Sequence, residues 1–258
     1  MDGVLSIYQF IQICLYHSLV TCHLSLYTFN WELYKMVYLT VNGAIVECPN
    51  ENTKLIRLLR DNLRLTSVKE GCGEGACGTC MVLVDNKPVR ACIPEVGKLA
   101  GKNIVTLEGI SEREKEVYSY SFASVGAVQC GFCIPGMIIC AKALLIHTHY
   151  PTRTEVKKAL RGNICRCTGY KKIIDAIQMA SELLHAGVRI PKTGFDGKLG
   201  VNLHRVDAKE KVQGTGLFTD DIVVDNMVYA KPCAPNTPAR ACLPSIILRL
   251  HYTRTVSA

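Results

Sequence analysis

The sequence GCGEGACGTC, residues 71–80, places Cys72, Cys77 and Cys80 in one glycine-rich loop, and Cys92 follows after eleven further residues. The resulting C-x4-C-x2-C…C spacing is that of the four thiolate ligands of a [2Fe–2S] cluster. The interleaved glycines let the backbone wrap closely around a cluster and turn its N–H groups toward the sulfurs. Structural zinc sites favour paired C-x2–4-C units instead. The spacing therefore favours an iron–sulfur cluster over zinc.

A second set of four cysteines lies further along the chain. Cys130 and Cys133 form a C-x2-C pair in QCGFC, and Cys165 and Cys167 form a C-x-C pair in GNICRCTGY. Four thiolates are again the full complement of one [2Fe–2S] cluster. Spacing alone leaves a zinc site or a redox dithiol open for this quartet.

The residues around the second quartet have helical patterns. Pro135 suits the first turn of a helix whose apolar face runs through residues 136–147. Thr152-x-x-Glu155 has the form of a capping box, and residues 170–184 repeat apolar positions at helical spacing. The second cluster is therefore expected between helix ends, and these surroundings favour iron–sulfur for it too.

Three motifs make the chain resemble a known family. They are GCGEGACGTC with Cys92, QCGFCIPGM and GNICRCTGY. The chain resembles the iron–sulfur subunit of the molybdenum hydroxylases, the xanthine dehydrogenase and aldehyde oxidoreductase family, over residues 36 to about 187. The resemblance implies an α+β chain: a β-grasp [2Fe–2S] ferredoxin domain at 36–112, followed by a four-helix-bundle [2Fe–2S] domain at 113–187. All eight cysteines of the two quartets occupy the family's ligand positions.

The resemblance also implies a function, that of an electron-transfer component of an oxidoreductase. Electrons would pass from a molybdopterin centre to the second cluster, then to the first, and on to a flavin or other acceptor. Gln129, beside Cys130, would contact the pterin or the cluster sulfurs. We expect no catalytic residue on this chain, with molybdopterin on a partner subunit or a downstream domain and FAD only on a partner.

Local patterns in the first domain agree with this fold. Asn42-Gly43 is a strong hairpin signal between strands at 37–43 and 44–48. Thr53 is expected to cap a helix with its apolar face at Leu55, Ile56, Leu59 and Leu63. Further strands are expected at 81–84, 88–91 and 104–107.

The remaining segments do not continue this pattern. Residues 1–35 are expected to be an extension outside the fold, from a start codon assigned too far upstream. A weak membrane or interfacial segment and a genuine ordered extension are the alternatives. Residues 188–203 are interpreted as a linker by their glycine-rich composition. Residues 204–231 resemble the opening of the family's molybdenum-binding subunit, which implies a fused chain. Residues 232–258 are interpreted as an out-of-frame tail, with a natural basic tail as the alternative.

Charge argues against nucleic acid as a partner. The chain carries 30 Lys and Arg against 22 Asp and Glu, and residues 36–187 carry 19 against 14. Two oxidised clusters with their thiolates add about −2 each, which nearly neutralises this excess. A cytoplasmic location without membrane attachment is expected. A zinc-binding structural module and a non-functional gene fragment stay open as alternatives.

Overall fold

A computed structural model defines the fold of most of the chain. It describes residues 36–187, 189–191, 199–200, 203–222, 224–231 and 249–251. The predictions for residues 1–35, and most of those for the linker and the tail, lie outside the described residues. The described residues from Met36 onward belong to one compact unit.

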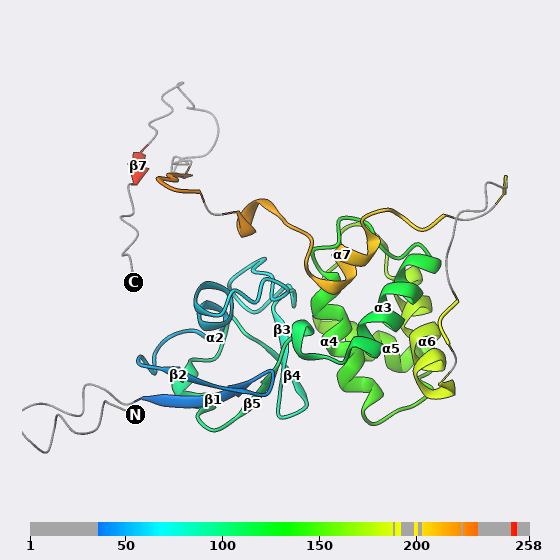
Figure 1. Cartoon of the computed structure of the whole chain (residues 1–258), viewed down its shortest axis with the longest axis horizontal. Coiled ribbons are helices and arrows are strands. Elements are labelled where there is room, and N and C mark those ends of the chain that lie inside the picture. The colour runs from blue at the N-terminus through cyan, green and yellow to red at the C-terminus, as the bar shows by residue number, and fades with distance from the viewer. Residues whose placement is uncertain are drawn as a thin grey trace, which may run out of the picture. The chain divides into compact units, whose positions relative to one another are not determined.

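Five strands form a mixed sheet in the order β2-β1-β5-β3-β4 (Figure 1). They are β1 Val37–Val41, β2 Ala44–Cys48, β3 Met81–Val84, β4 Lys87–Arg90 and β5 Asn103–Val105. β1 pairs with β2 and β3 with β4 as antiparallel hairpins, while β5 lies parallel to β1 and antiparallel to β3. Asn42 and Gly43 both have positive φ, 51° and 87°, as a tight hairpin turn requires. The predicted first hairpin is confirmed.

One short helix packs against the sheet. It begins as α2 Leu55–Arg57 and continues as a π-helical turn, Leu58–Asn62, with four buried apolar residues facing the sheet. The prediction that Thr53 caps it was wrong, because Lys54 is the N-cap and makes no side-chain cap bond. The first N–H groups donate instead to carbonyls distant in sequence: Leu55 to Pro94 and Ile56 to Ala91, each at 3.0 Å.

The β5 strand is shorter than predicted. Thr106 leaves the sheet, with its N–H donating to Asn42 Oδ1 at 2.9 Å, and a 3₁₀ turn at Leu107–Gly109 follows.

We call Val37–Ile110, the part of the chain that contains the five strands and α2, the sheet half.

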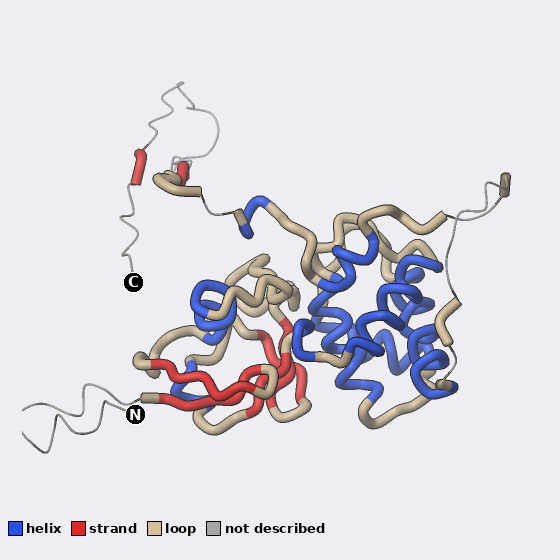
Figure 2. Tube along the Cα trace, in the orientation of Figure 1, coloured by secondary structure: helices blue, strands red, loops and turns tan. Residues whose placement is uncertain are grey.

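Residues 111–186, the helical half, contain four α-helices (Figure 2). They are α3 Glu112–Ser124, α4 Ile134–Leu145, α5 Arg153–Ala159 and α6 Lys171–Ala186. Pro135 lies in the first turn of α4, and Thr152 with Glu155 forms the predicted capping box of α5. Only the family resemblance implied a helix at α3, and no local pattern was assigned to it, although Ser111 and Glu114 form a capping box there too.

The two halves share a hydrophobic core. Met81 and Leu83 of β3 pack in the same buried cluster as Phe122, Met137 and Ile177 of the helices. A second cluster lies within the sheet half, between α2 and the sheet. The shared core fixes the two cysteine-bearing regions relative to each other.

Beyond the linker, a further short helix packs on the helical half. Helix α7, Ala208–Gln213, buries Ala208 and Val212 in the helical core. The short strands β6 Tyr229–Lys231 and β7 Arg249–His251 pair antiparallel. None of the helices in the described ranges has the length and apolar character needed to cross a membrane.

Candidate functional site

The 71–80 loop directs backbone N–H groups at one sulfur. Cys72 Sγ accepts from the N–H groups of Glu74, Ala76 and Cys77 at 3.3–3.4 Å. The donors at Cys77 and Glu74 favour the thiolate and lower the pKa of Cys72 to about 6. The loop therefore stabilises negative charge on sulfur, as a cluster ligand requires.

The other three cysteines of the first quartet lie beside Cys72. Cys77 Sγ is in side-chain contact with Cys72, and it lies 3.2 Å from the Thr79 hydroxyl oxygen. The β3–β4 hairpin brings Cys92 back to Cys80, where the two thiols are in hydrogen-bonding contact. Burial, and then the neighbouring thiols, raise the pKa of Cys80 to about 12. The structure thus gathers this quartet as a half-exposed pair and a buried pair.

The second quartet comes together between the helices. Cys133 is buried at the N-cap of α4, and Cys165 lies on the loop before α6. The thiol of Cys130 contacts that of Cys167, and the thiol of Cys133 contacts that of Cys165. Burial, more than the adjacent thiols, raises the pKa of Cys133, while partial desolvation and then the Cys167 thiol raise the pKa of Cys130. This quartet also consists of two pairs.

The donor set fits a binuclear cluster. Four thiols in two contacting pairs provide two thiolates for each of two irons.

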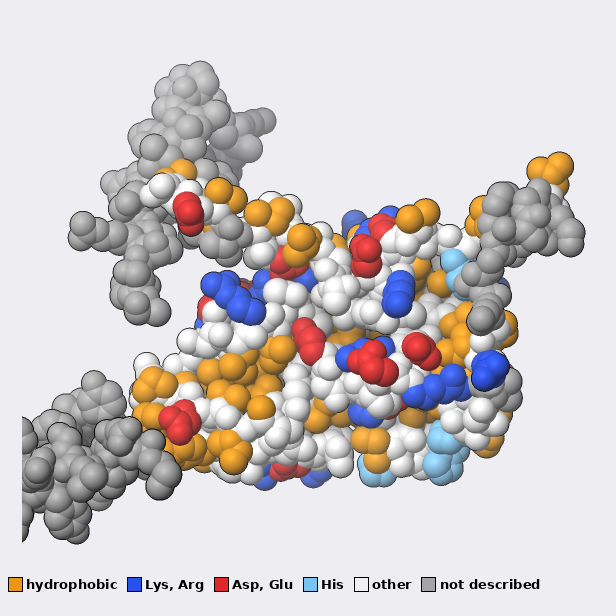
Figure 3. Space-filling view, viewed as in Figure 1, with side chains coloured by type: hydrophobic (Ala, Val, Ile, Leu, Met, Phe, Trp, Pro, Cys, Tyr) orange, Lys and Arg blue, Asp and Glu red, His pale blue; other side chains and the backbone are white. Residues whose placement is uncertain are grey.

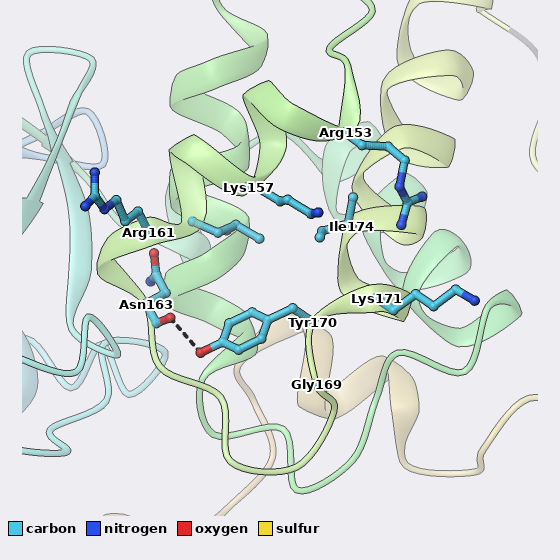
Figure 4. Close-up of a pocket in the computed structure, with 9 residues that line it drawn as sticks. Arg153, Lys157, Arg161, Asn163, Gly169, Tyr170, Lys171 and Ile174 are labelled. Atoms are coloured by element: carbon cyan, nitrogen blue, oxygen red, sulfur yellow. Dashed lines mark hydrogen bonds between the residues drawn. The ribbon is translucent and has the colours of Figure 1, made fainter.

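Tyr170 holds the C-x-C loop in place. Its hydroxyl accepts from Cys165 N–H at 2.9 Å and donates to Asn163 O at 3.2 Å (Figure 4). Its own N–H donates to Thr168 Oγ1 at 3.2 Å, which leaves the Thr168 hydroxyl hydrogen free to donate to Cys165 Sγ, 3.0 Å away. Burial acts to raise the pKa of Cys165, but the Thr168 hydroxyl and nearby N–H groups outweigh it and lower that pKa. Tyr170 has a left-handed φ of 68°, which costs about 1–3 kcal/mol in a non-glycine residue.

Replacing Tyr170 with phenylalanine is expected to weaken the second cluster selectively. The change leaves Cys165 N–H and Asn163 O without their partner, at a cost of about 1–3 kcal/mol. We expect the second cluster's EPR signal to disappear on milder heating than in the wild type, with the first signal unchanged. Tyr150→Phe is the matched control, because Tyr150 is 65% exposed. Equal heat sensitivity in the two variants would show that the Tyr170 hydroxyl does not support the loop.

Two hydrogen bonds to backbone carbonyls join the cysteine loops to each other. Ile164 N–H donates to Cys77 O at 2.9 Å, and the Asn163 side-chain amide donates to Gly78 O at 2.9 Å. Asn163 is buried, and its Oδ1 accepts from the thiol of Cys140 at 3.1 Å. The residue before Cys165 is thus hydrogen-bonded to a cysteine of the first quartet. The sequence analysis missed Asn163 and Tyr170, since nothing in their spacing indicates these contacts.

The second quartet has an exposed side. Cys130 and Cys167 are exposed, as is Gln129 beside them. A nearby pocket of about 460 Å³ borders the C-x-C loop at Asn163, Gly169 and Tyr170 (Figure 4). Its cationic lining residues are Arg153, Lys157, Arg161 and Lys171.

Both cysteine regions match known domain families. Residues 39–101 match the 2Fe-2S iron-sulfur cluster binding domain, and residues 106–178 match the [2Fe-2S] binding domain. The nicotinate dehydrogenase small FeS subunit of Eubacterium barkeri is 47% identical over 150 residues, 57% of this chain and 94% of that subunit. The chain belongs to the iron–sulfur subunits of the molybdenum hydroxylase family. It is therefore a component of an oxidoreductase, as the sequence resemblance implied.

Solved structures of two oxidoreductases share this fold. The aldehyde oxidoreductase of Desulfovibrio desulfuricans matches with a TM-score of 0.70 at 37% identity, over 76% of this chain and 23% of that one. A chain of quinoline 2-oxidoreductase from Pseudomonas putida matches with a TM-score of 0.55 at 37% identity, over 60% of this chain and 98% of that one. The chain thus spans about a quarter of one neighbour and nearly all of the other. The predicted ferredoxin-like fold is confirmed.

Proposed function

We propose that the chain conducts electrons through two [2Fe–2S] clusters of a molybdenum hydroxylase, from a molybdopterin centre to a flavin or other acceptor. Each cluster, when bound, takes up and releases one electron at a time. The proposed ligands are Cys72, Cys77, Cys80 and Cys92 for the first cluster, and Cys130, Cys133, Cys165 and Cys167 for the second. The observation that carries the proposal is the 2.9 Å hydrogen bond from Ile164 N–H to Cys77 O. It gives a short path through the backbone from Cys165 to Cys77.

Exposure suggests which surfaces meet the donor and the acceptor. Gln129, Cys130 and Cys167 are exposed on the second quartet, so a molybdopterin-bearing partner has access there, with Gln129 as a pterin contact. The first quartet reaches the surface through the loop at 71–76, most of which is exposed. We assign this loop to the acceptor side.

The proposed domain organisation follows the family. A β-grasp ferredoxin domain at 36–112 and a four-helix-bundle domain at 113–187 would hold the clusters. A linker at 188–203 would lead to the start of a molybdenum-binding domain at 204–231. The packing of α7 on α3 and α4 supports a fused chain, because it docks this last segment on the iron–sulfur part.

The proposed partners are a molybdenum-binding catalytic subunit or domain and, where present, a FAD subunit. We propose that neither nucleic acid nor a membrane is a partner. We also propose a cytoplasmic location. Figure 3 shows acidic and basic side chains interspersed over the helical half on the face in view, and hydrophobic ones gathered over the sheet half. The mixture of charges on that face differs from the basic stripe that a nucleic acid would need.

Low-temperature EPR of anaerobically purified, dithionite-reduced protein tests the proposal. We expect two distinguishable S = ½ signals and about four irons per chain, two for each cluster. Zinc in place of iron, with no signal, would contradict electron transfer and favour the structural module. Two clusters in a chain that captures no molybdenum subunit in its native cell would favour the gene fragment.

A further inference from the structure

Residues 203–222, which we call the strap, lie against both halves. On the helical half, α7 buries Ala208 and Val212 against α3 and α4. His204 Nε2 lies 3.1 Å from Ser124 Oγ, and its ring packs edge-on to Tyr120 with centroids 5.8 Å apart. The start of the strap is therefore fixed by apolar and polar contacts together.

The strap packs closely against both halves at two glycines, where a side chain would leave no room. Gly131, directly after Cys130, has φ +88°. The aliphatic carbons of Lys211 lie 2.7–2.9 Å from the position that a Cβ on Gly131 would occupy. Gly214 of the strap meets Ser67 of the sheet half, whose Cβ lies 2.5 Å from the corresponding position. A side chain at either glycine would push the strap away.

An aromatic anchor follows these glycines. Phe218 packs edge-to-face on Phe132, with ring centroids 5.2 Å apart and planes at 87°. Lys69 Nζ lies 4.7 Å from the centroid of the same ring, on the sheet half. Phe218 thus contacts both halves. Phe132 lies between Cys130 and Cys133, so the anchor also touches a cluster loop.

A buried ion triad ends the strap. Asp221 binds Lys69 at 2.6 Å and Arg60 at 2.8 Å, and the exposed fractions of the three side chains are 1%, 1% and 9%. Asp221 also accepts from Phe218 N–H at 3.1 Å, which closes the turn between them. Burial lowers the pKa of Lys69, and the bond to Asp221 acts against this lowering. Cations this deeply buried are costly unless an anion meets them.

We propose that Arg60, Lys69, Gly131 and Phe132 form an acceptor site for a peptide of the form Phe-x-x-Asp folded in a single 3₁₀ turn. The strap, with Phe218 and Asp221, is its occupant in this chain. Because the site draws on both halves, the occupant ties the sheet half to the helical half beside the second quartet. None of the four residues of the site is a proposed metal ligand.

Fluorescence anisotropy on the full chain, with a labelled peptide of residues 203–222, tests the site. The host chain carries Asp221→Asn, which weakens its own strap, and the matched control host carries Asp225→Asn, since Asp225 is an exposed aspartate just beyond the strap. We expect the peptide to bind the Asp221→Asn host at least about tenfold more tightly than the control host, whose own strap competes. A peptide that itself carries Asp221→Asn should bind the Asp221→Asn host about a hundredfold more weakly than the unchanged peptide does.

Equal binding of the two peptides would overturn the proposal, because no acid-recognising site would then exist. Equal binding to the two hosts would overturn it as well. A Phe218→Ala host, which keeps the ion triad, replaces the Asp221→Asn host if that variant fails to fold. Limited proteolysis gives a second readout: cleavage within 214–222 should be at least about tenfold faster in Asp221→Asn than in Asp225→Asn.

Discussion

Replacing Cys77 with serine is expected to abolish the first cluster's EPR signal, leave the second's intact and halve the iron content. Serine removes one of the four proposed thiolates, but it keeps the backbone carbonyl that accepts from Ile164 N–H. The C-x-C loop therefore keeps its attachment to the sheet half. Iron should fall from about four to about two per chain. The reciprocal change, Cys133→Ser, should remove only the second signal.

Cys48→Ser is the matched control for this prediction. Cys48 is a buried cysteine of the sheet half outside both quartets, and its thiol donates to Asn50 O at 3.3 Å. A serine hydroxyl can make the same bond, so both EPR signals should remain. Loss of both signals in Cys77→Ser would contradict two separate cluster sites.

Replacing Gly78 with alanine is expected to separate the two cysteine loops. Gly78 has φ +70°, and a Cβ there would overlap Gly162 O and lie 3.0 Å from Asn163 Cα. The left-handed φ costs about 1–2 kcal/mol, and forcing the two backbones apart adds about 1–3 kcal/mol. We expect the free energy of unfolding to fall by about 2–5 kcal/mol. The magnetic interaction between the reduced clusters should weaken as the loops separate.

Gly101→Ala isolates the contact from the backbone strain. Gly101 has φ +72°, and nothing lies within 4 Å of the position of its Cβ. This control should lose only the strain contribution, about 1–2 kcal/mol, with the magnetic interaction unchanged. Urea unfolding followed by visible circular dichroism measures the stabilities, and low-temperature EPR measures the interaction. Equal losses of unfolding free energy in Gly78→Ala and Gly101→Ala would show that the loops do not need the close approach at Gly78.

Local signals made much of this fold predictable. Asn42-Gly43 indicates its turn because both positions need positive φ, and Thr152-x-x-Glu155 indicates a helix start because two side chains satisfy two backbone groups. Local patterns missed helix α3 because its first turns are strongly charged and its buried face mixes Ser119 and Ser121 with Val117, Tyr118 and Phe122. Its Ser111-x-x-Glu114 capping box was the signal that could have identified it.

The contacts that position the site were beyond sequence reasoning. Ile164 meets Cys77 and Asp221 meets Lys69 across long sequence separations, so no local period or spacing indicates them. Tyr170 in a left-handed conformation contradicts the usual preference of its residue type. The start of α2 at Lys54, in place of the predicted Thr53 cap, likewise depends on the carbonyls of Pro94 and Ala91. Cysteine spacing predicts the ligands, but only tertiary structure shows how the two loops meet.

The junction between the cysteine loops also limits how such a chain can evolve. It is built from the carbonyls of Cys77 and Gly78, the N–H of Ile164, a missing Cβ at Gly78 and one amide side chain, Asn163. Most of these groups are backbone atoms, which any residue supplies, so neighbouring side chains are free to diverge while the distance between the two quartets stays fixed. If recombination replaced the sheet half alone, the new half would need a glycine at the position of Gly78. If it replaced the helical half alone, the new half would need an asparagine at the position of Asn163. The two halves are therefore expected to be inherited as a pair, with new domains joined only at their outer ends.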